Sequence, residues 1–94
     1  MARRGIKRTQ YEIYWEILTY CEIPRLFTSI IQRCDLNSKN GQEYLDFLER
    51  KGYIARSSEG GKTTYSTTRA AKVFVDLFAR LYLELYQDSP EFKI

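Results

Sequence analysis

The fold is decided by residues 28–54, which read TSIIQRCDLNSKNGQEYLDFLERKGYI. Apolar residues recur at helical spacing on both sides of a short turn at residues 35–37, which predicts two helices in close succession. Asn37 is a residue type that favours the N-cap of the second of these helices. Gly52 suits the left-handed position that ends a helix. We therefore expect a tight turn between two helices, the second of them over 38–51.

A further helix is predicted upstream of this segment. Residues 9–12 read TQYE, the capping-box spacing, in which the Thr hydroxyl and the Glu carboxylate each accept a hydrogen bond from a backbone N–H. The apolar residues that follow fall on one stripe of that helix: Ile13, Tyr14, Ile17, Leu18 and Cys21. Pro24 has no N–H to donate and suits the first turn of the next helix, which we expect to run to about Cys34.

The period of the sequence changes past Gly52. Two short runs rich in Tyr, Ile and Thr, residues 53–57 and 62–67, are separated by a glycine-containing turn. This arrangement predicts a β-hairpin. A final helix is expected after it, capped by Thr67 or Thr68 and apolar over more than half of its circumference.

This order of elements predicts an α+β winged helix-turn-helix, in which the third helix can enter a major groove and the hairpin lies over neighbouring backbone. A chain of 94 residues is the length of one domain. We expect a basic arm at 1–8, a core at 9–67 that includes a wing at 54–67, a dimerisation helix at 68–87 and a tail at 88–94.

The same residues resemble a known family. The run 28–54, followed by GKTTYSTT at 61–68, is similar to the small archaeal winged-helix regulators and chromatin proteins typified in Sulfolobus and in its spindle-shaped viruses. The resemblance covers about residues 10–86, and YLDFL at 44–48 with KGYI at 51–54 is its most specific part. It implies the winged-helix fold, dimeric assembly through the last helix, and double-stranded DNA as the ligand.

Three positions depart from that family's usual pattern. Ser29 stands where the family usually has a basic residue, Gly41 where it has a large apolar residue, and Ala71 where it has Gly. Ser29 and Gly41 are expected to lie in or beside the DNA-facing segment. Base specificity is therefore not inferred from the resemblance.

The residues expected to contact DNA lie in four segments. Asn and Gln suit adenine and Lys can reach guanine, while basic and hydroxyl groups bind phosphate. The expected set is Arg3, Arg4, Lys7 and Arg8 in the arm, Ser29 and Arg33 in the second helix, Ser38, Lys39, Asn40 and Gln42 in the third, and Arg56, Lys62 and Thr63 in the wing. Phosphate would repel Glu43, Asp46 and Glu49, so the C-terminal half of the third helix is expected to point away.

Charge is concentrated in the arm. The formal net charge is +3, and the first eight residues hold four basic residues and no acid, so the other 86 residues carry a net charge of −1. Binding to a polyanion must therefore use the arm and a local basic face. The alternative is that the arm is a solvated tail.

Apolar residues exceed what a single core requires, because some lie outside the stripe of the first helix and the last helix is apolar beyond one face. Soluble monomers rarely expose such a surface, whereas a two-fold dimer would cover it. The expected dimer-interface residues are Tyr11, Trp15, Phe74, Leu77, Phe78, Leu81, Tyr82 and Leu85. Stacking of these aromatics on single-stranded nucleic acid is the less favoured interpretation, because most fall at helical spacing.

The composition excludes several function classes. Histidine is absent, which removes the commonest general base and the usual catalytic zinc ligands, so we expect neither an enzyme nor a bound cofactor, metal or small molecule. The chain has no apolar run long enough for a membrane span and no signal-peptide pattern, which favours a cytoplasmic protein. Cys21 and Cys34 are expected to be buried thiols, with a disulfide as the alternative in a hyperthermophile.

The predicted function is a homodimeric, sequence-specific transcriptional regulator that binds double-stranded DNA, with helix 38–51 in the major groove and wing 54–67 on the backbone. Two alternatives stay open: an architectural chromatin protein with low sequence specificity, and a winged-helix module that binds a protein. Salt dependence and the ratio of specific to random affinity separate the three.

Overall fold

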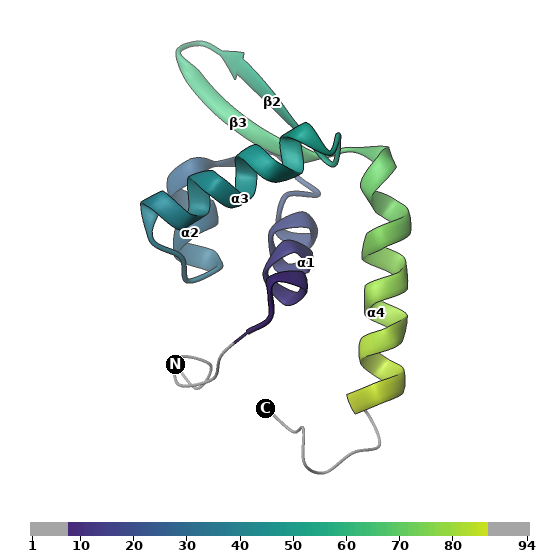
Figure 1. Cartoon of the computed structure of the whole chain (residues 1–94). Helices are drawn as coiled ribbons and strands as arrows, with labels where there is room; N and C mark the ends of the chain where they lie inside the picture. Colours follow the sequence, from purple (N-terminus) through teal and green to yellow (C-terminus); the bar gives the residue numbers. More distant parts are fainter. Residues whose placement is uncertain (1–7, 87–94) are drawn as a thin grey trace.

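The computed structural model describes residues 8–86 of the chain, apart from the side chains of residues 85 and 86. The elements follow in the order α1 (Gln10–Tyr20), β1 (Arg25–Leu26), α2 (Phe27–Arg33), α3 (Ser38–Arg50), β2 (Ile54–Glu59), β3 (Lys62–Thr67), a 3₁₀ turn (Arg69–Ala71) and α4 (Lys72–Tyr86). Figure 1 shows α3 lying across the end of α1, the β2–β3 hairpin extending beyond them, and α4 running alongside α1. The architecture confirms the predicted α+β winged helix-turn-helix.

Helix α1 begins where the capping box predicts. The Thr9 hydroxyl accepts a hydrogen bond from the Glu12 N–H at 3.1 Å, and the Glu12 carboxylate accepts one from the Thr9 N–H at 2.7 Å. Two backbone donors that the helix itself cannot satisfy are thereby paired. The predicted inner stripe is confirmed at Ile13, Ile17 and Leu18, which are buried.

The prediction that a helix begins at Pro24 was wrong. Residues Arg25 and Leu26 instead form a short strand, β1, whose partners are Tyr65 and Thr64 of β3. Helix α2 therefore starts only at Phe27. The strand is stabilised by a segment almost forty residues further along the chain, so the local helical spacing of the sequence does not reveal it.

The turn between α2 and α3 and both ends of α3 agree with the sequence. Asn37 is the N-cap, and its side-chain oxygen accepts a hydrogen bond from the Asn40 N–H at 2.7 Å. Gly52 ends the helix with φ +81°, which L residues with a side chain rarely adopt. Asp35 adopts φ +61° in the turn itself, a conformation that Asp tolerates better than most residues.

Gly41, which the sequence places in or beside the DNA-facing segment, lies on the buried side of α3. A Cβ atom built on Gly41 would lie 2.5 Å from Cγ2 of Ile31 on α2. The two helices of the motif therefore approach each other closely at this point. Because Gly41 has no side chain, α2 and α3 can pack this closely. Its role is therefore in helix packing.

The wing is a two-residue hairpin at one side of a three-stranded antiparallel sheet of order β1-β3-β2. Strand β2 extends to Glu59, two residues beyond the predicted end, and Glu59 pairs with Lys62 across the turn. Gly60 and Gly61 form that turn with φ +58° and +81°. Both values are accessible to Gly without strain, which explains why the turn is glycine-rich.

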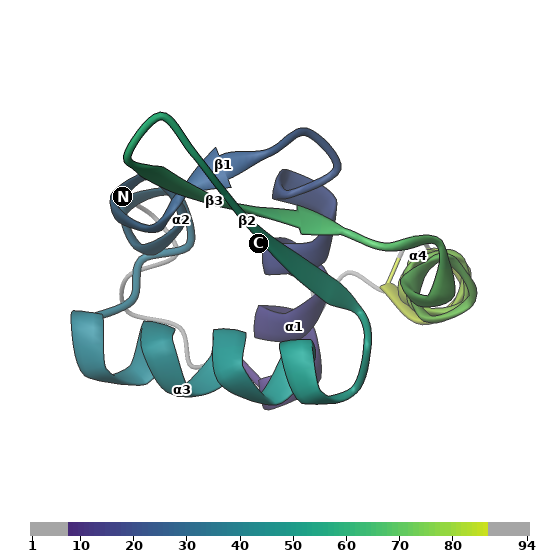
Figure 2. The same ribbon diagram turned by 90° about the horizontal axis from the view of Figure 1, so that it is seen from above.

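The core lies between the three helices of the motif and the base of the wing. Its fully buried large side chains are Ile17, Leu18, Ile30, Leu45 and Leu48, with Cys21 and Cys34. Both cysteines are buried thiols, as expected. Seen from above in Figure 2, α4 lies at the end of the molecule opposite α2.

Helix α4 follows a 3₁₀ turn that the sequence did not predict. Thr68 occupies the N-cap position of that turn, but its hydroxyl donates to the Gly52 carbonyl at 2.5 Å instead of capping the helix. This bond joins the end of α3 to the start of the last helical segment. Within residues 8–86, no helix is both long enough and apolar enough to span a bilayer.

Candidate nucleic-acid interface

The first turn of α3 is open to solvent. Ser38, Lys39 and Asn40 are exposed there, and the Asn37 cap holds the backbone from which they project. Hydroxyl, ammonium and amide groups at the start of an exposed helix are suited to base edges and phosphates. Three of the four predicted contacts on this helix are therefore accessible.

Gln42, the fourth, is already engaged within the helix. Its side-chain amide donates a hydrogen bond to the Asp46 carboxylate at 2.9 Å, and the residue is half-buried. Gln42 would have to leave this partner before it could bind a base. The contact also partly satisfies Asp46, one of the acids that the sequence analysis expected to oppose phosphate.

Arg56 of the wing is held by α3. Its Nη2 and Nε donate to the two carboxylate oxygens of Glu49 at 2.9 and 3.3 Å. The hydrogen bond and charge of Glu49 raise the pKa of Arg56 above its ordinary value. The pair links strand β2 to the C-terminal half of α3, so Arg56 would have to leave Glu49 before its guanidinium could bind a phosphate.

The tip of the wing carries the remaining predicted contacts. Lys62 is exposed beside the glycine turn. Thr63 is half-buried, and its hydroxyl lies 3.1 Å from that of Ser58 on the opposite strand. Lys62 is therefore the wing residue best placed to meet an anion.

The two predicted contacts on α2 are Ser29 and Arg33. Arg33 places its guanidinium 5.7 Å from the ring centroid of Tyr20, and Arg25 covers the same ring at 4.0 Å. Ser29 is half-buried one helical turn before Arg33. Both cations therefore pack on the Tyr20 ring of α1.

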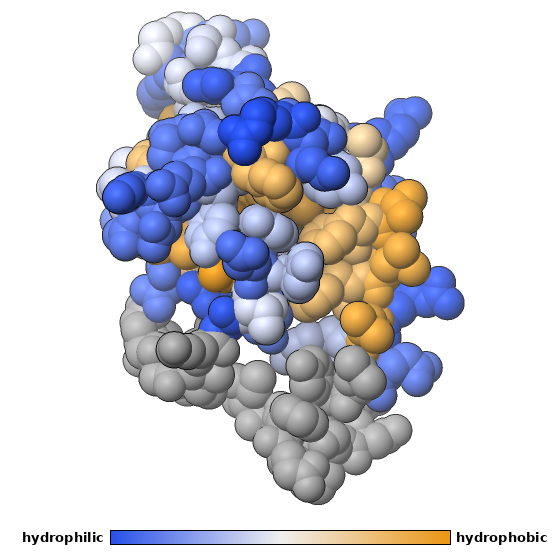
Figure 3. Space-filling model, viewed as in Figure 1, coloured by the Kyte–Doolittle hydropathy of each residue, from blue (hydrophilic) through white to orange (hydrophobic). Residues whose placement is uncertain are grey.

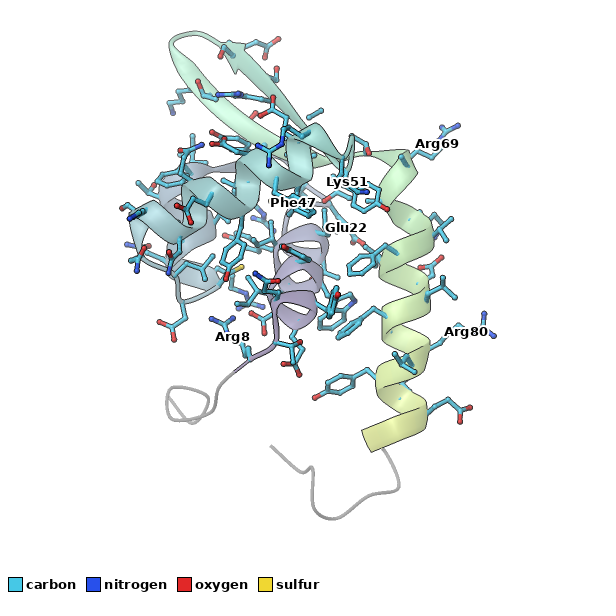
Figure 4. The ribbon with its side chains drawn as sticks, in the orientation of Figure 1. Arg8, Glu22, Phe47, Lys51, Arg69 and Arg80 are labelled. Carbon is cyan, nitrogen blue, oxygen red and sulfur yellow. The ribbon has the colours of Figure 1, made fainter. Side chains whose placement is uncertain are left out.

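Arg8 belongs to the folded body and not to a separate arm. Its guanidinium forms an ion pair with Glu16 on α1 and donates to the Asp35 carbonyl at 3.3 Å. The residue thus joins α1 to the turn before α3, and Figure 4 shows it beside the start of α1. Arg3, Arg4 and Lys7, the other predicted arm contacts, lie outside the described residues.

Two basic residues outside the predicted contact set are exposed at the end of α3. Arg50 follows Lys39 by eleven residues, three helical turns, and so shares its outward face, and Lys51 is adjacent. Helical periodicity alone could have identified Arg50. Glu43 is also exposed on this face, and residues 38–62 contain only one more basic than acidic residue. The face is therefore polar but close to neutral.

Half of the predicted dimer interface packs within one chain. Trp15 on α1 contacts Phe78 and Tyr82 on α4 at ring-centroid distances of 5.6 and 6.3 Å. Phe74 stacks on Tyr53 at 6.2 Å. These aromatics attach α4 to its own winged-helix body, so the excess of apolar residues on α1 and α4 is partly satisfied without a partner.

The outer side of α4 carries an apolar stripe. Val73, Leu77 and Leu81 recur every four residues and are 65%, 57% and 53% exposed. In Figure 3 the hydrophobic colour extends over the α4 side of the molecule. Tyr11, also predicted at the interface, is exposed on α1, whereas the side chain of Leu85 lies outside the described residues.

Comparisons with known proteins support the winged helix-turn-helix fold. The family model described as winged helix-turn-helix matches residues 7–84. The uncharacterized protein MJ0287 of Methanocaldococcus jannaschii is 31% identical over 85 residues, which cover 89% of this chain and 76% of that protein.

Two solved structures share the fold. Sso10a-2, a DNA-binding protein from Sulfolobus solfataricus, superposes with a TM-score of 0.72 at 28% identity, over 85% of this chain and 87% of that one. MepR, a transcription regulator from Staphylococcus aureus, has a TM-score of 0.72 at 18% identity, over 92% and 66% of the two chains, and shows a likeness of fold alone. On its elements, its caps and the residues matched, the chain belongs to the winged helix-turn-helix family.

Proposed function

We propose that this protein binds double-stranded DNA as a homodimer and acts as a sequence-specific transcriptional regulator. The observation that carries the proposal is the exposed, polar first turn of α3. The same fold carries a wing whose tip presents the exposed Lys62. The similarity to Sso10a-2, which is a DNA-binding protein, supports it. In this proposal α3 enters the major groove and the wing follows the backbone.

The roles of the side chains follow from their chemistry. The Asn40 amide can donate to and accept from adenine, and the Lys39 ammonium can reach guanine or a phosphate. Lys62 at the wing tip and Arg50 on the outward face of α3 are assigned to phosphate. Gln42 is left out of this set because its amide is bonded to Asp46.

Dimerisation is proposed through the outer stripe of α4. Val73, Leu77 and Leu81 would expose three branched apolar side chains in a monomer, and apposition of two copies about a two-fold axis would bury both stripes. The two α3 helices would then face successive major grooves, roughly 34–36 Å apart. A palindromic site with half-sites about one turn apart is the expected operator.

The test begins with selection of bound duplexes from a random pool, followed by affinities for the selected and a random duplex at several salt concentrations. We expect affinity to fall as salt rises and the selected duplex to bind at least roughly a thousandfold more tightly than the random one. Equal affinity for both duplexes would identify a low-specificity chromatin protein. No binding to any duplex would favour a protein-interaction module.

Lys39→Ala provides the local test of the interface. It should weaken binding to the selected duplex by about 1–3 kcal/mol. Arg69→Ala is the matched control, because it also removes one exposed cation, but from the 3₁₀ turn before α4, on the side of the molecule away from the first turn of α3 (Figure 4). Equal losses in the two variants would show that α3 does not contact the DNA.

Leu81→Asp tests the assembly. Because Leu81 is more than half exposed, this variant should fold and sediment as a monomer with weakened DNA binding. Leu83→Asp is the control, since Leu83 is 56% exposed but lies outside the stripe, roughly 160° around the helix from Leu81 and roughly 80° from Val73. Sedimentation of the unmodified protein as a monomer at tens of micromolar would contradict the dimer.

A further inference from the structure

The wing presents one of its faces to the core. The strand register places three cross-strand pairs on this face: Ile54 with Thr67, Arg56 with Tyr65, and Ser58 with Thr63. Ile54 and Tyr65 are buried, whereas Ser58 is exposed. Arg56 therefore lies at the level where the hairpin leaves the core and enters solvent.

At this level the guanidinium of Arg56 is held from two sides. Glu49 on α3 accepts two hydrogen bonds from it, at 2.9 and 3.3 Å, and the Tyr65 ring centroid lies 5.9 Å from its Cζ. A two-point contact between a planar guanidinium and a carboxylate fixes orientation as well as distance. The contact thus constrains the angle between the wing and the helix that carries Lys39.

Small changes of that angle are amplified at the tip of the wing. Arg56 is four residues from Gly60, so the hairpin extends about 13 Å from Arg56 to its tip at the usual rise along a strand. A tilt of about 10° would move the tip by roughly 2 Å. Such a displacement is comparable to the length of a hydrogen bond, so Lys62 and α3 would no longer meet the same duplex together.

We propose that Glu49 and Arg56 are positioning residues, which hold the wing at the angle that lets α3 and the wing tip bind one duplex. Arg56 acts through Glu49 and not by contact with phosphate. This inference rests on the proposed DNA-binding function. It assigns to an acidic residue of α3 a favourable role in binding a polyanion.

The proposal reverses the effect expected from charge alone. Glu49→Gln removes a negative charge close to the DNA-facing surface, which by itself raises affinity for a polyanion. If Glu49 positions the wing, the same substitution lowers affinity, by about two- to fivefold for the loss of an exposed ion pair. Unfolding should change little, because exposed pairs contribute little to stability.

The experiment compares Glu49→Gln, the control Glu43→Gln and the double variant Glu49→Arg/Arg56→Glu on the selected duplex. Glu43 is an exposed acid of the same helix, so its substitution should leave affinity unchanged or raised. The double variant keeps the net charge and the pair, and should bind within about twofold of the unmodified protein. Tighter binding by Glu49→Gln, or weak binding by the double variant, would overturn the positioning role.

A second measurement needs no DNA and separates this proposal from the proposed function. Spin labels attached at Glu59→Cys and Gln32→Cys, both exposed, report the distance between wing tip and body, while Cys21 and Cys34 are buried. Glu49→Gln should broaden the distance distribution and Glu43→Gln should not. Unchanged distributions in both would refute the positioning role even if the protein binds DNA. Broadening without binding to any duplex would show that the Glu49–Arg56 pair fixes the wing, but would overturn the proposed DNA-binding function and the positioning role with it.

Discussion

Substitution of Gly41 by Ala should destabilise the protein, although helix propensity alone predicts the opposite. In a helix interior Ala is favoured over Gly by about 1 kcal/mol. At this position the new Cβ would lie 2.5 Å from Cγ2 of Ile31. Carbon atoms normally approach to about 3.5–4.0 Å, so the methyl group or the helix must move by about 1 Å.

The Ile31 side chain has little freedom to move. Its Cγ2 is attached directly to a branched Cβ, which holds χ1 in one preferred rotamer within a helix. Overpacking of this kind costs about 1–3 kcal/mol. Against the propensity gain of about 1 kcal/mol, the expected net destabilisation is about 0–2 kcal/mol. The clash term itself is best isolated by a second substitution that removes Cγ2.

Urea unfolding of Gly41→Ala, Ile31→Ala and the double variant isolates that term. In the Ile31→Ala background the clash is absent, so Gly41→Ala should stabilise the protein by about 1 kcal/mol. The coupling free energy between the two positions is therefore about 1–3 kcal/mol. The control is Gly52→Ala, where no atom lies within 4 Å but φ is +81°, so its cost of about 1–2 kcal/mol should not depend on Ile31. Stabilisation by Gly41→Ala alone, with no coupling, would show that α2 and α3 do not approach this closely.

Three further predictions concern the caps, the buried thiols and the arm. Thr9→Ala removes the capping hydroxyl of α1 and should lower the free energy of unfolding by about 1 kcal/mol, measured in urea, and Thr9→Ser should not. Burial, with a smaller contribution from Cys34, raises the pKa of Cys21 from 9.0 to about 12, so the native state keeps a proton that the unfolded chain loses. The free energy of unfolding should be unaffected by this group below pH 9 and should fall between about pH 9 and 12, by at most about 1.4 kcal/mol per pH unit. An equal fall in the Cys21→Ala variant would show that other groups cause the loss of stability. Deletion of residues 1–7, which keeps Arg8, should flatten the slope of log affinity against log salt by about 0.9 for each of Arg3, Arg4 and Lys7 that contacts DNA, and an unchanged slope would identify a solvated tail.

The features that the sequence predicts correctly are those with local causes. The capping box at Thr9, the Asn37 cap and the Gly52 stop each depend on residues within a few positions of one another. Strand β1 was missed because its partners, Tyr65 and Thr64, are distant in the chain. Period and propensity cannot detect a two-residue strand that only tertiary pairing stabilises.

The same distinction applies to the site. Helical spacing identifies Lys39 and Asn40 as outward residues, and both are exposed. It cannot show that Arg8, Arg33 and Arg56 each contact a residue of another element, because those contacts depend on how the elements are arranged. Residue type therefore overestimates the number of cations available to a ligand. For α4, helical spacing indicates more apolar residues than one face requires. It does not show which of them pack on α1 and which stay exposed.

The segment proposed to face DNA, residues 38–62, carries little net positive charge. Residues 38–62 have only one more basic than acidic residue, and Glu49 engages Arg56. A chromatin protein that binds any sequence depends mainly on phosphate contacts, and this face offers few of them. Lys39, Arg50 and Lys62 as phosphate contacts would give a salt slope of about 2.7 in magnitude for each protomer, or about 5.4 for the proposed dimer, without the arm. Under the proposed function, contacts to base edges from the first turn of α3 add to this sequence-independent contribution, and the ratio of selected to random affinity measures them. A much steeper slope after deletion of residues 1–7, with equal affinity for selected and random duplexes, would contradict this reasoning.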